Sequence, residues 1–304
     1  MVTLKKIAVT TTTFGKYDRR PLDLLEKKGF EIKLNPYGRK PEKQETFEIC
    51  KDSTGIIAGT ETLDCELIKK LKNLKVISRC GAGIDNVDQN AARKRGIKIF
   101  NTPDAPTLAV AELTVGLILN LLRRITYMHI VLKGKKWKKS MGSLLYKKKV
   151  GIIGFGRIGG KVAGLLKPFG CEIAYADSYI EAGFAKLRRL SLRELLGWAD
   201  IVSLHASGGQ KILGKKEIKA MKKGAWLVNT SRGGTVDEDE LYKALKEGYL
   251  SGAAIDVFER EPYAGPLNKL NNIILTPHIG SYTRESRVEM ERQAVLNLLK
   301  GLEE

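Results

Sequence analysis

The chain has 304 residues, of which 43% are hydrophobic and 29% are charged. This composition excludes a disordered or a collagen-like chain, and the length predicts two domains with a cleft between them, since a domain typically holds roughly 100 to 200 residues. The longest nearly continuous apolar stretch, residues 113–122, is about half as long as a membrane-spanning helix. No secretory leader begins the chain, so we expect a cytoplasmic protein.

The charge is strongly positive, since 53 Lys and Arg outnumber 34 Asp and Glu by 19. Such an excess raises the question of a nucleic acid or another anionic partner. The basic residues, however, occur in short clusters beside apolar helix positions, without the interleaved aromatic residues of RNA-binding segments. We therefore expect solvated basic faces and no nucleic-acid partner, with a polyanion-binding patch as the weaker alternative.

Four cysteines are spaced 15, 15 and 91 residues apart. These spacings match neither a zinc site nor a CxxC redox pair. We therefore expect reduced packing residues and no metal site. The cysteines are Cys50, Cys65, Cys80 and Cys171.

Short apolar runs alternate with helical patterns over the first hundred residues, which is typical of β-α-β units with parallel strands. A cluster of helix-breaking residues at 101–106 ends this unit. In chain order we expect strand 5–10, helix 21–28, strand 30–35, strand 55–59, helix 64–73, strand 74–80, helix 85–95 and strand 97–101.

A long apolar-rich segment, residues 108–132, follows and predicts one continuous helix of roughly six or seven turns. A second α/β series then begins, and helices between its strands again favour a doubly wound parallel sheet. We expect strand 150–153, helix 157–166, strand 172–176, a helix after 191, strand 201–205, helix 216–223, strand 225–229, helix 237–247, strand 253–257, strand 272–275 and helix 283–302.

A glycine motif opens the second series. Three glycines with the spacing GxGxxG follow the apolar strand 150–153 and precede a helix, and Asp177 stands 18 residues after the last of them. Glycines let the backbone approach a pyrophosphate, the helix N-terminus attracts its charge, and the carboxylate accepts from ribose hydroxyls. The carboxylate favours NAD over NADP, although Arg188 and Arg189 keep NADP open. The expected cofactor contacts are Gly154, Gly156, Arg157, Ile158, Gly159 and Asp177.

Several further blocks resemble the D-isomer-specific 2-hydroxyacid dehydrogenase family over nearly the whole chain. One block looks like the family's substrate loop, two look like its hinge, and four look like its catalytic segments. The blocks are SRCGAGIDNVD at 78–88, NTP at 101–103, VAE at 110–112, NTSRG at 229–233, AIDVF at 254–258, EP at 261–262 and TPHIG at 276–280.

The resemblance implies that Arg232, Glu261 and His278 are the catalytic residues. Reduction of a 2-keto acid needs a hydride on carbon, a proton on oxygen and a partner for the carboxylate. Arg232 offers a fork of donors for the carboxylate and the ketone oxygen. His278 would donate the proton in reduction and accept it in oxidation. Glu261, if bonded to the other ring nitrogen, would stabilise the imidazolium.

The resemblance also implies further contacts with substrate and cofactor. The turn formed by Gly81, Ala82 and Gly83 offers backbone amides to the substrate carboxylate. After His205 the family commonly has a proline and threonines that contact the cofactor, whereas this chain has ASGGQ at 206–210 and departs from the family pattern there. The remaining implied cofactor contacts are His205, Thr230, Asp256 and Gly280.

The fold implied is α/β, with two Rossmann-like doubly wound parallel-sheet domains. A flavodoxin-like substrate or lid domain spans residues 1–100 together with 283–304, and the NAD-binding Rossmann domain spans 101–282. Substrate is expected to close the lid and exclude water. Family members commonly pair through the helix that begins at Leu108, so we expect a homodimer.

The resemblance implies D-3-phosphoglycerate and 3-phosphohydroxypyruvate as the expected substrate pair, with a second subgroup of the family as the alternative. D-3-phosphoglycerate dehydrogenases of serine biosynthesis are the most similar in their motifs, yet an arginine that often binds the substrate phosphate near Gly59 is absent. Lys40, Lys133 or Lys135 could replace it; the alternative is a glyoxylate or hydroxypyruvate reductase. We expect no regulatory C-terminal domain and no serine feedback through one. Glu261 argues against a formate dehydrogenase.

A non-enzymatic alternative is an NAD-sensing binding protein, because the C-terminal-binding-protein corepressors share the fold, the glycine motif and the catalytic trio. The absence of a disordered tail favours an enzyme.

Overall fold

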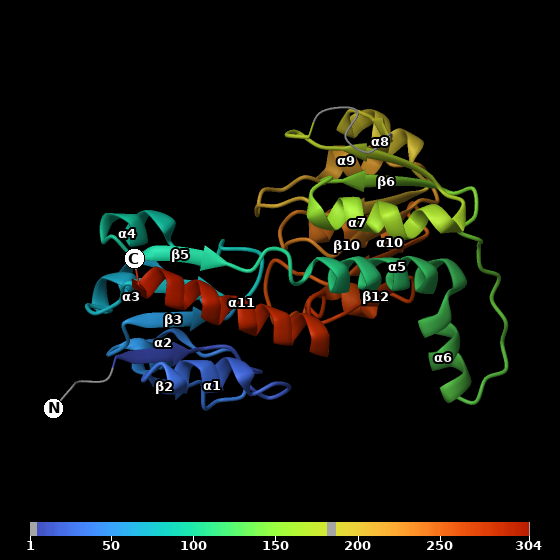
Figure 1. Cartoon of the computed structure of the whole chain (residues 1–304). Helices are drawn as coiled ribbons and strands as arrows, with labels where there is room; N and C mark the ends of the chain where they lie inside the picture. The colour runs from blue at the N-terminus through green and yellow to red at the C-terminus, as the bar shows by residue number, and fades with distance from the viewer. Residues whose placement is uncertain (1–4, 181–186, 304) are drawn as a thin grey trace. The chain divides into compact units, whose positions relative to one another are not determined.

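A computed structural model describes residues 5–180 and 187–303 (Figure 1). The chain forms two compact units, one of residues 1–106 with 281–304 and the other of residues 107–280. The boundary lies six residues beyond the position expected from the sequence. The segment after residue 100 stays with the first unit because the N–H of Thr102 donates to Gly81 O at 3.0 Å and Ser286 Oγ donates to Ala105 O at 3.0 Å.

The first unit contains a five-stranded parallel sheet in the order β2-β1-β3-β4-β5. The order reverses between β1 and β3, as in doubly wound folds. Its strands are β1 (Lys6–Val9), β2 (Glu31–Leu34), β3 (Gly55–Ala58), β4 (Val76–Arg79) and β5 (Lys98–Asn101). Its helices are α1 (Arg20–Lys27), α2 (Lys43–Cys50), α3 (Cys65–Lys70), α4 (Gln89–Lys94) and α11 (Arg284–Glu303).

Two helical layers cover this sheet. Helices α2, α3 and α4 pack apolar side chains on one face, and α1 and α11 pack on the other. The C-terminal helix α11 is tied to the sheet along its length, since Ser78 Oγ of β4 donates to Ala294 O at 2.8 Å. The fully buried Glu291 accepts from Thr13 Oγ1 and from the N–H of Gly15, both at 3.0 Å. Helix α11 is therefore part of the first unit's core.

The second unit contains a seven-stranded parallel sheet in the order β12-β11-β10-β9-β6-β7-β8. Its order reverses between β6 and β9, where the chain begins to add strands on the other side. The strands are β6 (Lys149–Ile153), β7 (Glu172–Ala176), β8 (Arg188–Arg189), β9 (Ile201–Leu204), β10 (Trp226–Asn229), β11 (Gly252–Ile255) and β12 (Ile273–Leu275). The helices are α5 (Thr107–Arg123), α6 (Ile125–Lys133), α7 (Arg157–Leu166), α8 (Leu192–Trp198), α9 (Lys215–Ala220) and α10 (Glu238–Lys246), with 3-10 turns at Lys167–Phe169 and Pro266–Lys269.

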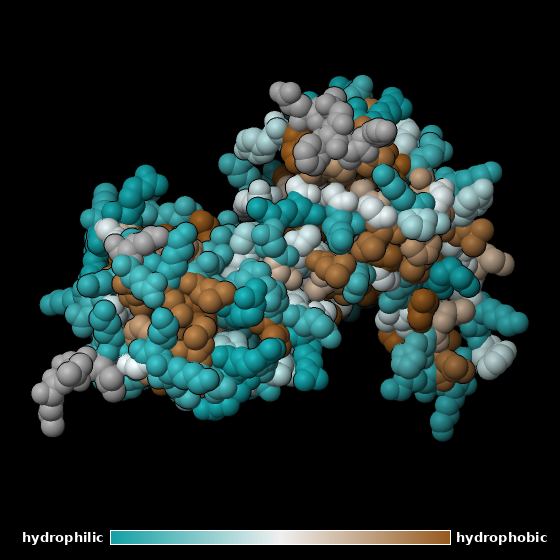
Figure 2. All heavy atoms as spheres, viewed as in Figure 1, coloured by the Kyte–Doolittle hydropathy of each residue, from teal (hydrophilic) through white to brown (hydrophobic). Residues whose placement is uncertain are grey.

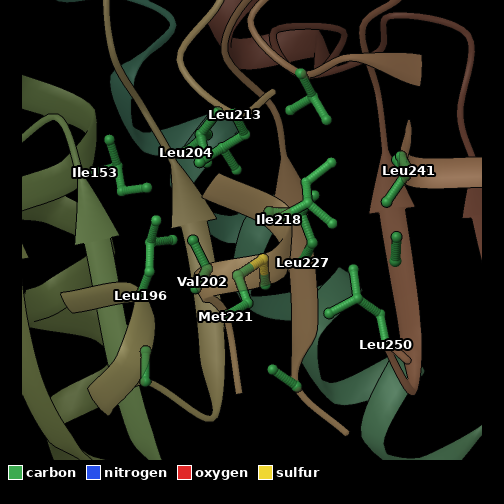
Figure 3. Close-up of a cluster of buried hydrophobic side chains, with 14 of the residues drawn as sticks. Ile153, Leu196, Val202, Leu204, Leu213, Ile218, Met221, Leu227, Leu241 and Leu250 are labelled. Atoms are coloured by element: carbon green, nitrogen blue, oxygen red, sulfur yellow. The ribbon is translucent and has the colours of Figure 1, made fainter. Parts of the chain in front are cut away.

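This sheet is likewise covered on both faces. Helices α8, α9 and α10 bury one apolar cluster against it, drawn in Figure 3 with Val202, Leu204 and Leu227 of the central strands at its middle. Helices α5 and α7 bury a second cluster on the opposite face. Strands buried on both faces are continuous apolar runs in the sequence, so their positions could be predicted from it. Both sheets confirm the expected α/β class.

The expected single helix over 108–132 is wrong, because the chain breaks at Arg124. Arg124 adopts the left-handed conformation with φ 54°. The side chain of Asn120 reaches across the break, accepting from the N–H of Thr126 at 2.9 Å and donating to Thr126 Oγ1 at 2.7 Å. This side chain therefore satisfies an N–H at the start of α6, which the helix leaves without an internal partner.

Other differences from the expected elements are one additional helix and two later helix starts. Helix α2 was not expected, since its apolar residues show little periodicity. Helices α3 and α4 begin later than expected because Asp64 and Asp88 act as N-caps, accepting from Leu67 N and Ala91 N at 2.8 Å. Residues 85–86 consequently form a turn, and Val87 pairs with Leu63 in an isolated parallel β-bridge. No helix in the described part of the chain is long and apolar enough to cross a membrane.

Candidate active site

The glycine motif forms the tight turn between β6 and α7, at the point where the strand order of the second unit reverses. Gly154 has φ +85°, and a Cβ there would lie 2.5 Å from Ala206 N, so the turn lies against the end of β9. A Cβ on Gly159 would lie 2.1 Å from Gly154 O, so this glycine permits close helix–strand packing. Any larger residue at either position would have to displace backbone.

The middle glycine is different, because a Cβ on Gly156 would meet no atom within 4 Å. Gly156 precedes the first turn of α7, where Arg157 is exposed and Ile158 is half-buried, and no side chain caps this end. The N–H groups at the start of α7 have no partner within the helix, and no side chain at Gly156 would keep an anion away from them. The three glycines thus fit the three separate demands of a dinucleotide pyrophosphate site.

Asp177 follows β7 and closes the same turn. Its Oδ2 accepts from Phe155 N at 2.7 Å, and its Oδ1 accepts from Tyr179 N at 2.7 Å and Ile180 N at 2.9 Å. Partial burial raises the pKa of Asp177, but these three N–H groups and Arg189 outweigh it and hold the pKa below its usual range. The carboxylate is therefore ionised and already orders the glycine turn before any ribose binds.

His205 directly follows β9 and lies beside Gly154. Its Nε2 lies 2.8 Å from Ser203 Oγ, and its Nδ1 has no hydrogen-bond partner among the described residues. Burial lowers the pKa of His205 to about 3, so the ring is neutral. The sequence analysis missed Ser203 as its partner, although residues two apart on a strand share a face. Its contact with the cofactor stays a prediction.

Thr230 and Arg232 follow β10. The buried hydroxyl of Thr230 lies 2.9 Å from Thr114 Oγ1 of α5, a pairing that the sequence analysis did not suggest. The segment's backbone is fastened by Thr235 Oγ1, which donates to Arg232 O at 2.7 Å. Arg232 Nη1 donates to Ser231 O at 2.8 Å. One end of the guanidinium is thus oriented by the backbone of its own loop.

Glu261 and His278 come together as the sequence analysis expected. His278 Nδ1 lies 2.9 Å and 3.1 Å from the two carboxylate oxygens of Glu261. Glu261 Oε1 also accepts from Phe258 N at 3.1 Å, which orients the carboxylate within its loop. Both side chains remain accessible, at 42% for His278 and 38% for Glu261. This arrangement leaves Nε2 of the imidazole as the ring nitrogen that does not contact Glu261.

Asp256 holds the loop of His278 by hydrogen bonds to residues on both sides of the histidine. It is almost completely buried, and it accepts from Thr276 Oγ1 at 2.6 Å, Ile279 N at 2.8 Å and Gly280 N at 2.9 Å. Burial raises the pKa of Asp256 although these donors oppose the shift. Its carbonyl oxygen accepts from His278 N at 2.9 Å. Asp256 therefore holds the loop in which His278 takes the left-handed conformation, with φ 53°.

The expected substrate turn lies in the first unit, after β4. Gly81 has φ +151°, and its N–H donates to Thr102 Oγ1 at 2.8 Å. Asn101 Nδ2 donates to Ala82 O at 2.6 Å. Strand β5 and the segment after it therefore fix the turn formed by Gly81, Ala82 and Gly83, at the carboxyl edge where ligands bind such sheets.

Three comparisons with known proteins agree with this geometry. A family model described as the NAD binding domain of D-isomer specific 2-hydroxyacid dehydrogenases matches residues 115–280. The chain is 42% identical over 256 residues to a D-3-phosphoglycerate dehydrogenase of Methanocaldococcus jannaschii, covering 81% of this chain and 49% of that protein. It is 36% identical over 285 residues to a glyoxylate reductase of Korarchaeum cryptofilum, covering 89% and 86%.

A solved structure extends the likeness to the whole fold. The crystal structure of D-lactate dehydrogenase from Aquifex aeolicus complexed with NAD and lactic acid matches with a TM-score of 0.84 at 27% identity, over 98% of this chain and 95% of that chain. The chain spans about half the length of the phosphoglycerate dehydrogenase named above. The family model, the glycine turn and the paired Glu261 and His278 agree, and the chain belongs to the D-isomer-specific 2-hydroxyacid dehydrogenase family.

Proposed function

We propose that Arg232, Glu261 and His278 interconvert a D-2-hydroxy acid and its 2-keto acid. The observation that carries the proposal is the 2.9 Å contact between His278 Nδ1 and Glu261 Oε2. A carboxylate on Nδ1 fixes the tautomer and stabilises the imidazolium, so Nε2 can give a proton to a ketone oxygen and take it back from an alcohol. Arg232 neutralises the substrate carboxylate and polarises the ketone.

NADH, when bound, supplies the hydride that reaches the keto carbon. We propose that Gly154, Gly156 and Gly159 give the pyrophosphate its access, and that Asp177 accepts from the ribose hydroxyls. Arg157, Ile158, His205, Thr230, Asp256 and Gly280 complete the proposed contacts. Support comes from the open space beside Gly156 and from the ionised, amide-bound carboxylate of Asp177. We also propose that the turn at 81–83 contacts the substrate carboxylate.

For the substrate itself we propose 3-phosphohydroxypyruvate and D-3-phosphoglycerate. The identity of 42% to the Methanocaldococcus jannaschii enzyme supports this choice, and the net charge of +19 is favourable for a phosphorylated acid.

The second candidate is a small unphosphorylated acid, glyoxylate or hydroxypyruvate. A specific feature at the end of β3 favours it. Gly59 presents no side chain there, and a Cβ on it would lie 2.8 Å from the buried carboxyl of Glu61. An acid rather than a cation thus occupies this strand end. The chain also spans 86% of the glyoxylate reductase of Korarchaeum cryptofilum.

The deciding experiment follows NADH oxidation with glyoxylate, hydroxypyruvate, pyruvate, longer 2-keto acids and 3-phosphohydroxypyruvate. A preference of orders of magnitude for the phosphorylated acid supports the first substrate, and the reverse preference supports the second. The variant His278→Ala should lose activity with every substrate while still binding NADH. No turnover with any acid would contradict the proposed reaction.

Arg232→Ala separates substrate binding from cofactor binding. Removing the guanidinium takes away the partner of the developing oxyanion, so kcat/KM should fall by at least roughly a hundredfold. NADH affinity, followed by fluorescence titration, should not change. A variant as active as the parent would remove Arg232 from the proposed mechanism.

We further propose that the protein is a homodimer that pairs through α6 and the segment after it. None of the residues of α6 is buried, although most are apolar, and Figure 1 shows the helix projecting from the rest of its unit. Hydrophobic side chains gather on this projection in Figure 2. Exposed apolar patches of this kind mark protein interfaces. The most exposed members are Ile130, Trp137, Met141, Leu144 and Tyr146.

A further inference from the structure

The loop that bears Glu261 is exposed and needs support from outside itself. Residues 259–261 are all exposed, between the buried Phe258 and the half-buried Tyr263. The rings of Phe258 and Tyr263 stack with centroids 4.3 Å apart, which anchors the two ends of the loop. The residues between them have little packing to fix their position. An active carboxylate on such a loop requires further contacts to hold its geometry.

The segment that follows Arg232 supplies two such contacts. At its start, a Cβ on Gly233 would lie 1.9 Å from Phe258 O, so the two backbones touch. At its end, Glu238 opens helix α10 and its Oε1 accepts from Glu259 N at 2.8 Å. The carboxyl thus binds the loop two residues before Glu261. One short stretch of chain therefore contacts the loop at two points.

We infer that Glu238 is a positioning residue that joins the segment bearing Arg232 to the loop bearing Glu261. The inference rests on the proposed roles of these two residues. By holding Glu259 N, Glu238 sets the place from which the Glu261 carboxylate meets the imidazole of His278. Small displacements of an acid–base pair reduce rate strongly, because proton transfer depends on distance and direction. Glu238 acts through the backbone of the loop, at Glu259 N, and not on a reacting group.

The surroundings of Glu238 are unfavourable for a carboxylate, which argues against a purely stabilising role. Partial burial raises the pKa of Glu238, and the neighbouring acids Glu259, Asp239 and Asp237 raise it further, against the lowering by the N–H of Glu259. A group that lies among like charges costs stability, and such costs are typical of functional positions. A neutral acceptor at position 238 should therefore leave the fold at least as stable.

The test compares Glu238→Ala, Glu238→Gln and Asp239→Asn in the full chain. Alanine removes the acceptor, whereas the amide oxygen of glutamine keeps it. Asp239 is the matched control because it is the next residue in the same helical turn and loses the same charge. The measurements are kcat and KM with the preferred keto acid, the Tm, and hydrogen exchange of the peptide that contains Glu259.

Glu238→Ala should lower kcat on the order of tenfold, with KM for NADH within about twofold and Tm within about 2 °C of the parent. Hydrogen exchange in the loop should become faster in this variant. Glu238→Gln should recover most of the parent's kcat, and Asp239→Asn should match the parent in every measurement.

A parent-like kcat in Glu238→Ala would overturn the inference. An equal loss of kcat in Glu238→Gln would also overturn it, because glutamine keeps the acceptor. So would a kcat loss in Glu238→Ala that disappears at a temperature where this variant is fully folded, because the loss would then come from unfolding. Unchanged exchange in the loop would disprove the contact itself, and this readout needs no turnover. A parent enzyme that reduces no keto acid would instead contradict the proposed function, so the two failures are distinguishable.

Discussion

Two carboxylates of the second unit show how one acid can order a whole loop. Asp177 accepts three backbone N–H groups around the glycine turn, and Asp256 accepts two N–H groups and a hydroxyl around His278. Hydrogen bonds to an ionised acceptor are stronger than those between neutral groups, and the lowered pKa of Asp177 keeps that carboxyl ionised. A carboxylate in such a position therefore organises its site before any ligand arrives. Replacing Asp177 should therefore weaken cofactor binding, and replacing Asp256 should impair catalysis, because each change releases the loop that the carboxyl holds.

Asp177→Ala tests this at the cofactor site. It removes the proposed ribose acceptor and the bonds from Phe155 N, Tyr179 N and Ile180 N. NADH affinity should therefore fall by about tenfold or more, which corresponds to about 1.4 kcal/mol. NADPH affinity should fall much less, because the repulsion of its 2′-phosphate disappears at the same time. Fluorescence titration with both cofactors measures the ratio. Asp177→Asn serves as the control, since it keeps an acceptor, and unchanged NADH affinity in the alanine variant would refute the role.

At the scale of elements, the carboxyl ends of neighbouring parallel strands gather the polar residues. Gly154 and His205 follow the two strands at the reversal point of the second sheet, as the general rule for open α/β sheets requires. The reversal point of the first sheet, between β1 and β3, holds Glu61. Its Oε1 accepts from Thr10 Oγ1 at 2.5 Å and Gly59 N at 3.1 Å, and it is 1% exposed.

Glu61 makes the stability of the first unit depend on pH. Burial raises the pKa of Glu61 above 4.5 despite its hydrogen bonds and Arg79. The folded state thus binds the proton more tightly than the unfolded chain. This contribution to the free energy of unfolding is complete below pH 4.5 and is lost as pH rises through the folded pKa. It amounts to about 1.4 kcal/mol for each tenfold difference in proton affinity between the two states.

Glu61→Gln removes this dependence. The Tm of the variant minus that of the parent should increase as pH rises from about 4 to about 8, as thermal unfolding at several pH values would show. Glu66→Gln is the control of opposite sign, because Lys43 and Lys70 lower the pKa of the exposed Glu66 to about 2. A Tm difference for Glu61→Gln that does not vary with pH would show that folding leaves the proton affinity of Glu61 unchanged.

At the scale of the whole molecule, no residue of helix α6 is fully buried against the described residues of its own chain. Its break from α5 at Arg124 directs it away from the sheet, so burial of its apolar surface needs another molecule. A second copy of the chain is the proposed occupant.

Ile130→Asp should separate the proposed dimer. Ile130 is 62% exposed, and a charge there would lie in the new interface without a partner. Sedimentation at micromolar concentration should give twice 33.7 kDa for the parent and 33.7 kDa for the variant. Leu296→Asp, on the exposed side of α11, is the matched control and should remain dimeric. A parent that sediments as a monomer would contradict the proposal.

The sequence by itself determined the fold class and the order of most elements, and its family blocks singled out Glu261 and His278 without fixing the contact between them. Strands buried on both faces and a GxGxxG motif are local signals, and the family blocks name these two residues wherever the chain later places them. The sequence did not predict the break at Arg124, because the apolar pattern continues through it. The break is accompanied by a side-chain cap, in which Asn120 accepts from the N–H of Thr126.

Only the tertiary structure decided which groups hold the proposed functional residues in place. The bonds from Asp256 to the loop of His278, and from Glu238 to Glu259, join segments that are distant in sequence, with separations of 23 and 21 residues. No periodicity or spacing encodes such contacts, because they depend on how neighbouring strands end beside one another. The residue types at the site are thus a property of the sequence, whereas their distances and the state of their charges follow from burial and hydrogen bonding in the folded chain.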